Sequence, residues 1–184
     1  MRELDLALFR AINQAPDWLN PAMQFFSEGN KWWWVRVGLV AVLVLFAWRQ
    51  NTRKATVLAM VAWPIANAAC DALKFGMRLP RPSVDLADAI VRVERLTSFG
   101  TASAHSATMM AVAVAFMFYS RPAGIAWLAV AVLTGVSRIY VGVHYPYQVL
   151  LGWAVGAFVA IVAVKSWMAF EHHRSASEPQ GESQ

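Results

Sequence analysis

Three stretches of the chain carry histidine, serine and basic side chains of the types that handle phosphate. Residues 74–82 read KFGMRLPRP, residues 98–106 read SFGTASAHS, and residues 137–148 read SRIYVGVHYPYQ. A phosphate group is anionic and rich in acceptor oxygens, so proteins hold it with guanidinium forks, ammonium groups and backbone amides. Each stretch lies at the end of an apolar run, and a shared phosphate site is therefore the first hypothesis.

Two histidines add the means to break a phosphate ester. One imidazole can attack phosphorus while another protonates the leaving oxygen, and a covalent phosphohistidine then splits the hydrolysis into two steps. His105 and His144 are the candidates. No cluster of carboxylates with metal-ligand spacing accompanies them in the sequence, so we expect neither a metal nor another cofactor.

Three cations and a serine are available to clamp the phosphate. They are Lys74, Arg81, Arg138 and Ser103. The amides at the start of the run after Ser103 would add a favourable helix dipole. Clamping charge on the phosphoryl oxygens is most of the work in phosphoryl transfer. Each residue alone would be read as an interfacial or buried structural group, but their convergence from three stretches favours a site.

The composition indicates a membrane protein. Of 184 residues, 58% are hydrophobic and 15% are charged, with a mean hydropathy of +0.43, which is more apolar matter than one soluble core can hide. In such a protein the net charge of +5 favours anionic membrane lipids over nucleic acid as partners. Cys70 is the single cysteine, which excludes a disulfide framework and a thiolate metal cluster.

Five apolar runs predict the architecture. Each approaches the length of about 20 residues that a helix needs to cross a bilayer, and the first is edged by tryptophan and basic residues, as membrane boundaries often are. The runs cover residues 32–48, 55–73, 103–119, 123–140 and 147–167. We therefore predict an all-α, polytopic membrane helical bundle of about five transmembrane helices, preceded by an amphipathic interfacial helix.

The order of the crossings places the three stretches on one face of the membrane. The second run ends beside Lys74, and the chain stays on that side through Arg81 until the third run begins near Ser103. The fourth run then returns to the same side with Arg138 and His144. An odd number of crossings between any two stretches would have contradicted a shared site.

The chain divides into three parts. Residues 1–30 form an amphipathic interfacial segment, in which Leu4, Leu8 and Ile12 recur with helical spacing. Residues 31–170 form the transmembrane domain. Residues 171–184 have the polar composition of a disordered tail.

The connection at residues 75–102 is too long to be a simple link. We predict a helix within it, over residues 83–95, because a serine cap, acidic residues in the first turns and basic residues near the end suit the helix dipole. These residues are Ser83, Asp85, Asp88, Arg92 and Arg95. A lid over the site and a plain interfacial helix are both compatible with this pattern.

Together the three stretches resemble the signature of the type-2 phosphatidic acid phosphatase superfamily, the membrane lipid phosphate phosphatases. The first block, a lysine, six residues and Arg-Pro, is matched in full by residues 74–82. The second, Pro-Ser-Gly-His, stands as ASAH at residues 102–105. The third, Ser-Arg, five residues, His, three residues and Asp, is matched by residues 137–148 except that Gln148 holds the final position.

The resemblance implies a role for each site residue. His144 would be the nucleophile and His105 the general acid. The phosphate would be bound by Lys74, Arg81, Ser103, Arg138 and the backbone amide of Ala104.

Two departures from the signature bear on activity. A carboxylate at position 148 would orient the His144 ring and stabilise its positive charge, whereas Gln148 brings no charge and its amide could also turn to present a donor. Ala104 in place of glycine narrows the backbone conformations beside the phosphate. The sequence thus leaves two alternatives: an active enzyme, or a catalytically impaired lipid-phosphate-binding or transport protein of the same fold.

The resemblance also implies a substrate class and a location. The modest length and the five-crossing plan resemble the bacterial undecaprenyl pyrophosphate phosphatases, which implies metal-independent removal of a terminal phosphate from a polyprenyl (pyro)phosphate. Phosphatidylglycerol phosphate, phosphatidate and lipid A phosphate stay open as substrates, and the oligomeric state is open too. The implied location is the bacterial inner (plasma) membrane, with the site facing outwards.

Overall fold

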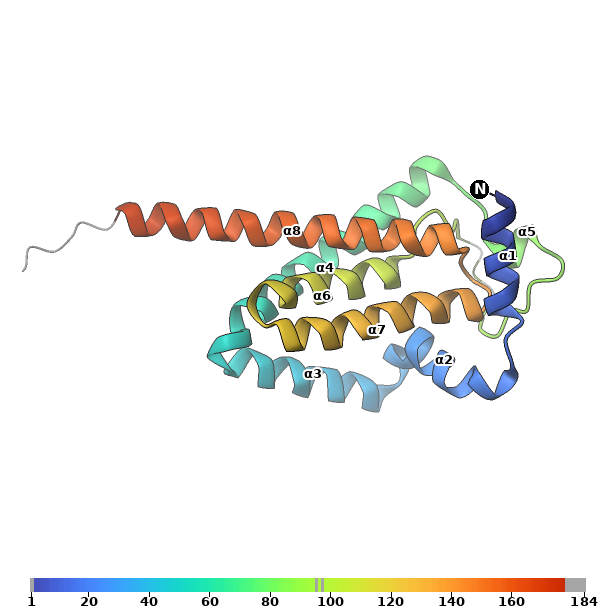
Figure 1. Ribbon diagram of the computed structural model, residues 1–184, viewed down its shortest axis with the longest axis horizontal. Coiled ribbons are helices and arrows are strands. Elements are labelled where there is room, and N and C mark those ends of the chain that lie inside the picture. The colour runs from blue at the N-terminus through green and yellow to red at the C-terminus, as the bar shows by residue number, and fades with distance from the viewer. Residues whose placement is uncertain (1, 95, 97, 178–184) are drawn as a thin grey trace, which may run out of the picture.

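The computed structural model describes residues 2–94, 96 and 98–177, and this part of the chain contains helices and no strand. Figure 1 shows the long helices running alongside one another, with α1 lying across one end of the bundle. The predicted all-helical membrane bundle is confirmed. In chain order the elements are α1 (Arg2–Asn13), η1 (Asp17–Leu19), α2 (Asn20–Glu28), η2 (Gly29–Lys31), α3 (Trp33–Trp48), α4 (Gln50–Met77), α5 (Pro82–Asp85), α6 (Ala104–Tyr119), α7 (Arg121–Tyr140) and α8 (Pro146–Ser177).

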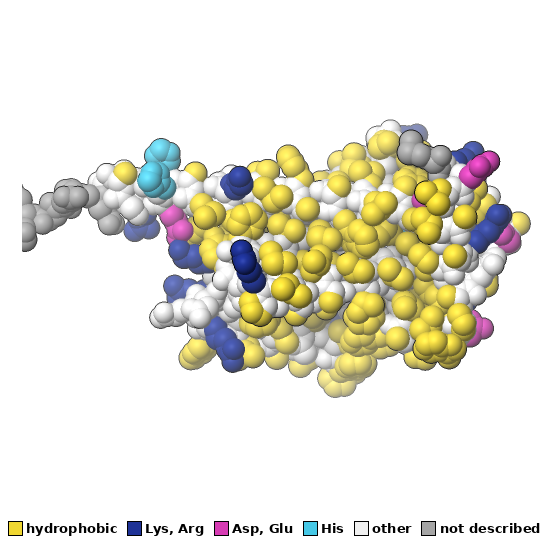
Figure 2. Space-filling view, in the orientation of Figure 1, with side chains coloured by type: hydrophobic (Ala, Val, Ile, Leu, Met, Phe, Trp, Pro, Cys, Tyr) yellow, Lys and Arg dark blue, Asp and Glu magenta, His cyan; other side chains and the backbone are white. Residues whose placement is uncertain are grey.

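Apolar surface covers the middle of the molecule. Figure 2 shows hydrophobic side chains over most of the visible face, with charged side chains mainly toward the two ends. The stretch Gln50–Asp85 and helices α7 and α8 are long and apolar enough to span a membrane, and Asp17–Lys31 with α3 qualifies as a pair bent by 75°. Helix α6 is a shorter apolar helix, so the number of five crossings stays a prediction.

Small residues let the central helices approach closely. Buried alanines and Cys70 from α4, α6 and α8 form one core cluster, as is typical where membrane helices pack tightly. A Cβ atom on Gly152 would lie 2.5 Å from the carbonyl oxygen of Ser103, and one on Gly156 would lie 2.0 Å from that of Ala107. These two glycines therefore set α8 directly against α6 and fix the position of the residues at the start of both helices.

The N-terminal helix is present as predicted over the residues that the structure describes. Helix α1 buries Phe9 and Asn13 against the bundle, while Leu4 and Leu8 remain exposed. Exposed leucines on a helix across the bundle end suit a membrane interface, and that placement stays a prediction.

The prediction of a helix over residues 83–95 is wrong. A single helical turn, α5, follows Pro82, and residues 86–94 are not helical. The side chain of Asn13 donates to the carbonyl of Ile90 at 2.8 Å and accepts from its amide at 2.9 Å. Because α1 supplies these hydrogen bonds, the loop satisfies its backbone without forming a helix of its own. Arg95 lies outside the described residues.

The predicted disorder from residue 171 does not hold for residues 171–177. Helix α8 continues through Ser177. Lys54 of α4 pairs with Glu171 at 2.6 Å, and Ser175 donates to the carbonyl of Glu171. An established helix adds residues at little further cost, so it extends past the apolar run. Residues 178–184 lie outside the described part.

Candidate active site

The three stretches meet at one end of the bundle. Lys74 lies near the end of α4, Ser103 caps the start of α6, and Arg138 lies near the end of α7. In Figure 1 these helix ends lie together near α1, and the turns between α3 and α4 and between α6 and α7 lie at the other end. The helix arrangement therefore brings the three stretches, residues 74–82, 98–106 and 137–148, to the same end of the bundle.

The imidazole of His144 lies buried between two polar side chains. Its Nε2 atom is 3.0 Å from Nη1 of Arg81, and its Nδ1 atom is 3.0 Å from Oε1 of Gln148. His144 is 3% exposed. It follows Gly142, which has a φ of +81°. This left-handed turn, which glycine adopts without strain, carries the chain from α7 back to α8 and places the ring.

The amide of Gln148 has a fixed orientation. Its Oε1 accepts from the amide of Tyr145 at 3.2 Å, and its Nε2 donates to the carbonyl of Pro80 at 2.8 Å. If the amide were flipped, its NH2 group would face the N–H of Tyr145 and its oxygen would face the carbonyl of Pro80. Because Oε1 faces the ring, Nδ1 of His144 carries the proton and Nε2 is left with a free electron pair. A neutral side chain thus holds the tautomer in which Nε2 carries no proton.

The surroundings of His144 favour the neutral ring. Burial lowers its pKa well below the ordinary value of 6.5, and the charges of Arg81 and Arg138 lower it further. The imidazole is therefore unprotonated at neutral pH, and it lies beside the guanidinium of Arg81.

Arg81 is held on several sides. Its Nε donates to the carbonyl of Ser98 at 2.7 Å and its Nη2 to the Ser98 hydroxyl at 3.1 Å. Its Nη1 donates to the carbonyl of Val143 at 2.9 Å. Ser98 was not among the predicted site residues, although it opens the second stretch. The guanidinium is consequently fixed beside the imidazole of His144.

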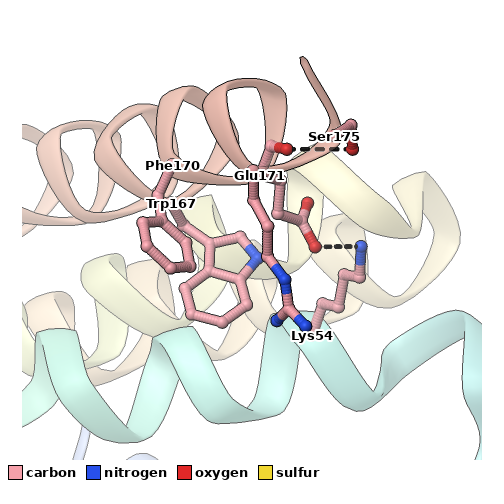
Figure 3. A pocket seen from close by; sticks show the side chains of 6 residues that line it. Lys54, Trp167, Phe170, Glu171 and Ser175 are labelled. Carbon is pink, nitrogen blue, oxygen red and sulfur yellow. Dashed lines mark hydrogen bonds and ion pairs between the residues drawn. The ribbon is translucent and has the colours of Figure 1, made fainter. Parts of the chain in front are cut away.

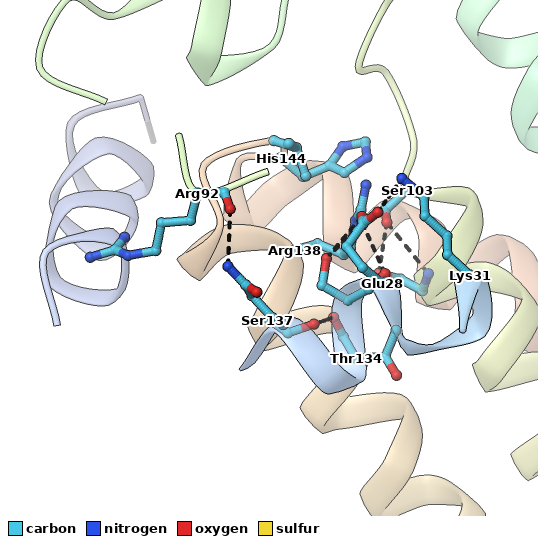
Figure 4. A network of polar contacts seen from close by, with 12 residues as sticks. Glu28, Lys31, Arg92, Ser103, Thr134, Ser137, Arg138 and His144 are labelled. Atoms are coloured by element: carbon cyan, nitrogen blue, oxygen red, sulfur yellow. Dashed lines mark hydrogen bonds and ion pairs between the residues drawn. The ribbon is translucent and has the colours of Figure 1, made fainter. Parts of the chain in front are cut away.

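Arg138 is the most buried cation of the site and has an acidic partner. It is 2% exposed, and its Nη1 contacts Oε1 of Glu28 at 2.7 Å and the hydroxyl of Ser27 at 2.7 Å. The other carboxylate oxygen of Glu28 pairs with Lys31. Figure 4 shows Glu28 between Arg138 and Lys31. Glu28 and Ser27 were not predicted from the sequence, because they come from α2, far from the three stretches.

The start of α6 offers backbone amides. Ser103 is buried, and its hydroxyl accepts from the amide of Ser106 at 3.4 Å and from the Ser106 hydroxyl at 2.9 Å. Ala104 and His105 are the first residues of the helix, where amides have no partner within the helix and the dipole favours an anion. The half-buried His105 imidazole lies in the field of the surrounding charged groups, which are Arg138, Glu28, Lys74 and Lys31.

Lys74 is turned toward its own helix. Its Nζ pairs with Asp71 at 2.7 Å, one turn earlier, and Asp71 also accepts from Asn67. Its charge acts on His144 less than the charges of Arg81 and Arg138 do. Lys74 therefore lies near the site but does not contact the residues around His144 in this structure.

A metal cluster is not apparent in the described residues, where no group of three or more His, Cys, Asp or Glu side chains could hold an ion. The geometry instead gathers cations, amides and imidazoles. Metal independence of the reaction stays a prediction.

Residues 55–171 match the family model of the PAP2 superfamily. The chain belongs to this superfamily. It is 29% identical over 164 residues to an undecaprenyl-diphosphatase of Sulfolobus acidocaldarius, covering 88% of this chain and 77% of that protein. It is 26% identical over 179 residues to the putative undecaprenyl-diphosphatase YbjG of Escherichia coli, covering 94% and 87%.

Two solved structures, the second of a transmembrane protein, have the same fold. The crystal structure of Aquifex aeolicus LpxE matches with a TM-score of 0.74 and 25% identity, covering 88% of this chain and 95% of that one. A PAP2-type phosphatidylglycerolphosphate phosphatase of Bacillus subtilis matches with a TM-score of 0.68 and 20% identity, covering 97% and 88%. With the apolar helices, these matches make the chain an integral membrane protein.

Proposed function

We propose that the protein is a lipid phosphate phosphatase that removes the terminal phosphate of a polyprenyl diphosphate through a phosphohistidine at His144. The observation that carries the proposal is the clamped imidazole, with Nδ1–H held by Gln148 and Nε2 facing Arg81. The family match and the undecaprenyl-diphosphatase relatives support the substrate class. Phosphatidylglycerol phosphate, phosphatidate and lipid A phosphate are the alternatives.

The reaction begins with attack on phosphorus by the lone pair of His144 Nε2. Arg81 donates to that atom in the structure, so its Nη1–H must turn to a phosphoryl oxygen as the substrate enters. A bond then forms from nitrogen to the terminal phosphorus, and the bond from that phosphorus to the bridging oxygen of the diphosphate breaks. The polyprenyl monophosphate leaves, and His105 gives its bridging oxygen a proton. Bound phosphate makes the protonated form of His105 favourable, because it adds negative charge to a cationic pocket.

The second step regenerates the enzyme. His105, now neutral, takes a proton from water, the water oxygen bonds to phosphorus, and the nitrogen–phosphorus bond breaks to release inorganic phosphate. Arg81, Arg138 and the amides of Ala104 and His105 stabilise the charge on the phosphoryl oxygens in both transition states. Gln148 keeps the ring in the attacking tautomer but adds no charge, so the rate should be lower than with a carboxylate.

Phosphate release from a panel of lipids tests the proposal. The purified protein in detergent is given polyprenyl diphosphate, phosphatidylglycerol phosphate, phosphatidate and lipid A phosphate, with and without a chelator. Release from the polyprenyl substrate that survives the chelator and is abolished by His144→Ala is the expected result. Binding of inorganic phosphate without release from any lipid would instead support the catalytically impaired binding protein.

The proposed location is the plasma membrane, with the site on the outer face. In a Cys70→Ser background, a cysteine introduced by Asp88→Cys lies in the exposed loop at the site end, and one introduced by Arg53→Cys lies at the other end. A membrane-impermeant maleimide applied to intact cells should label the first and not the second. Labelling of the second alone would place the site on the inner face.

A further inference from the structure

The ion pair between Arg138 and Glu28 joins two parts of the chain that lie 110 residues apart. It is the best-buried ion pair among the described residues, with 3% and 16% of the two side chains exposed. The hydroxyl and the carbonyl of Ser27 also accept from Nη1 of Arg138, at 2.7 and 3.2 Å. Three acceptors from α2 therefore hold one nitrogen of the guanidinium.

The opposite edge of the guanidinium is unused. Nε of Arg138 is buried and has no hydrogen-bond partner, and Nη2 makes no hydrogen bond within the part of the chain that the structure describes. Nε–H and Nη2–H form a parallel fork that matches two oxygens of a phosphate. A buried N–H group without a partner costs free energy, and a ligand oxygen would relieve that cost.

We propose that Glu28 is a positioning residue for Arg138, which holds Nη1 so that the Nε–Nη2 edge is presented to the substrate phosphate. This inference rests on the proposed function, because it concerns the same phosphate site. Glu28 also compensates the buried charge of Arg138 when no phosphate is bound, and an uncompensated charge there would be costly.

Lys31 anchors the carboxylate itself. The second oxygen of Glu28 pairs with Lys31 at the end of η2, where 58% of the lysine side chain is exposed. Glu28 is thus held from both sides, by a buried arginine and by a surface lysine (Figure 4). A carboxylate held in this way orients Arg138 and does not compete with the substrate for its free edge.

The test compares Glu28→Ala with Glu28→Gln by two measurements, the Kd for inorganic phosphate and the KM for the lipid substrate. Alanine leaves Nη1 without its side-chain acceptor from Glu28, and we expect both values to rise about tenfold, which is about 1.4 kcal/mol. Glutamine keeps a carbonyl oxygen within reach of Nη1 but removes the negative charge of Glu28. Both the Kd and the KM should therefore stay within about threefold of the wild-type values. Rescue by glutamine is a result that a purely charge-balancing role would not give.

Glu171→Ala is the matched control, because it removes an ion pair of similar length at the other end of the bundle, and it should leave both values unchanged. If Glu28→Ala does not fold, Ser27→Ala removes one acceptor while the charge pair remains, and we expect a smaller rise in both values. The inference would be overturned if Glu28→Ala, or Ser27→Ala in its place, had the wild-type Kd and KM. It would also be overturned if Glu28→Ala and Glu28→Gln raised both values equally. A wild-type protein that binds phosphate but releases none from lipids contradicts only the proposed function, since the phosphate Kd still tests Glu28.

Discussion

Two ion pairs of nearly equal length lie at opposite ends of the bundle. Arg138 and Glu28 are 2.7 Å apart at the site end, with 3% and 16% of their side chains exposed. Lys54 and Glu171 are 2.6 Å apart at the other end, with 49% and 38% exposed. Figure 3 shows the second pair on the surface near Trp167 and Phe170. Similar geometry thus occurs in two very different environments.

The environment decides what each pair contributes. An exposed pair adds about 0–1 kcal/mol to the free energy of unfolding, because water already solvates both charges. Breaking a buried pair by removing one partner costs about 3–5 kcal/mol, because the remaining charge is left without compensation. A protein that needs only stability has little reason to bury an arginine. We therefore attribute the buried charge of the site end to its proposed role in binding phosphate.

The largest contrast is between the histidines of the two ends. His144→Ala removes the attacking nitrogen, and we expect phosphate release to fall by about 10⁴-fold or more. His172→Ala changes an exposed ring near the end of α8 and should leave the rate within twofold, about the scatter of such assays. Single-turnover release from labelled substrate measures both. Equal rates for His144→Ala and the wild type would contradict the assignment of the nucleophile.

Gln148 gives the next largest effect. Gln148→Ala removes the acceptor that fixes Nδ1–H, and we expect kcat to fall by about 10²- to 10⁴-fold with a much smaller change in KM, as for the loss of an orienting group in a serine-protease triad. Gln148→Glu keeps the acceptor for His144 and adds a stabilising charge, but it places an oxygen against the carbonyl of Pro80 where the amide donated. Because this loss opposes the gain in charge, we expect a kcat between those of Gln148→Ala and the wild type. A wild-type kcat for Gln148→Ala would show that the ring needs no orienting partner.

The two ion pairs can be compared by stability alone. Glu28→Met leaves the buried charge of Arg138 without its acidic partner, and we expect a loss of about 3–5 kcal/mol in the free energy of unfolding. Lys54→Met should cost about 0–1 kcal/mol. Denaturant unfolding in detergent, followed by tryptophan fluorescence, measures both variants. Similar losses for the two would mean that water reaches the site end as freely as the other end.

The sequence predicted the parts of the fold that depend on local pattern. Five apolar runs became the helices α3, α4, α6, α7 and α8 because hydrophobic length alone specifies such segments. The order of crossings then brought Lys74, Arg81, Ser103, Arg138 and His144 to one end, since each intervening helix reverses the chain direction. Neither step required knowledge of any contact between side chains.

The sequence failed where distant residues satisfy one another. Asn13 takes over the hydrogen bonds of Ile90, which prevents the helix that the charges of residues 83–95 would favour. Glu28 pairs with Arg138 across 110 residues, and no local pattern encodes that partnership. One signal was available: a buried arginine in an apolar run requires an acidic partner, and Glu28 lies in the segment before the first run. The pairing of Lys74 with Asp71, three residues earlier, was also visible in the sequence.

The smallest expected effect is a pH dependence confined to the site end. Because the pKa of His144 lies well below 6.5, kcat/KM should be retained as the pH falls through 6.5 and should decline only at more acidic pH. Gln148→Glu places a carboxylate beside the ring, which stabilises the protonated form, so the acid limb should move to higher pH. The unfolded chain binds a proton near pH 6.5 that the folded chain does not. The free energy of unfolding should therefore fall as the pH drops below 6.5, and His144→Ala should remove this part of the decline. An acid limb at 6.5 in the wild type, unmoved by Gln148→Glu, would mean that the ring is solvated like a surface histidine.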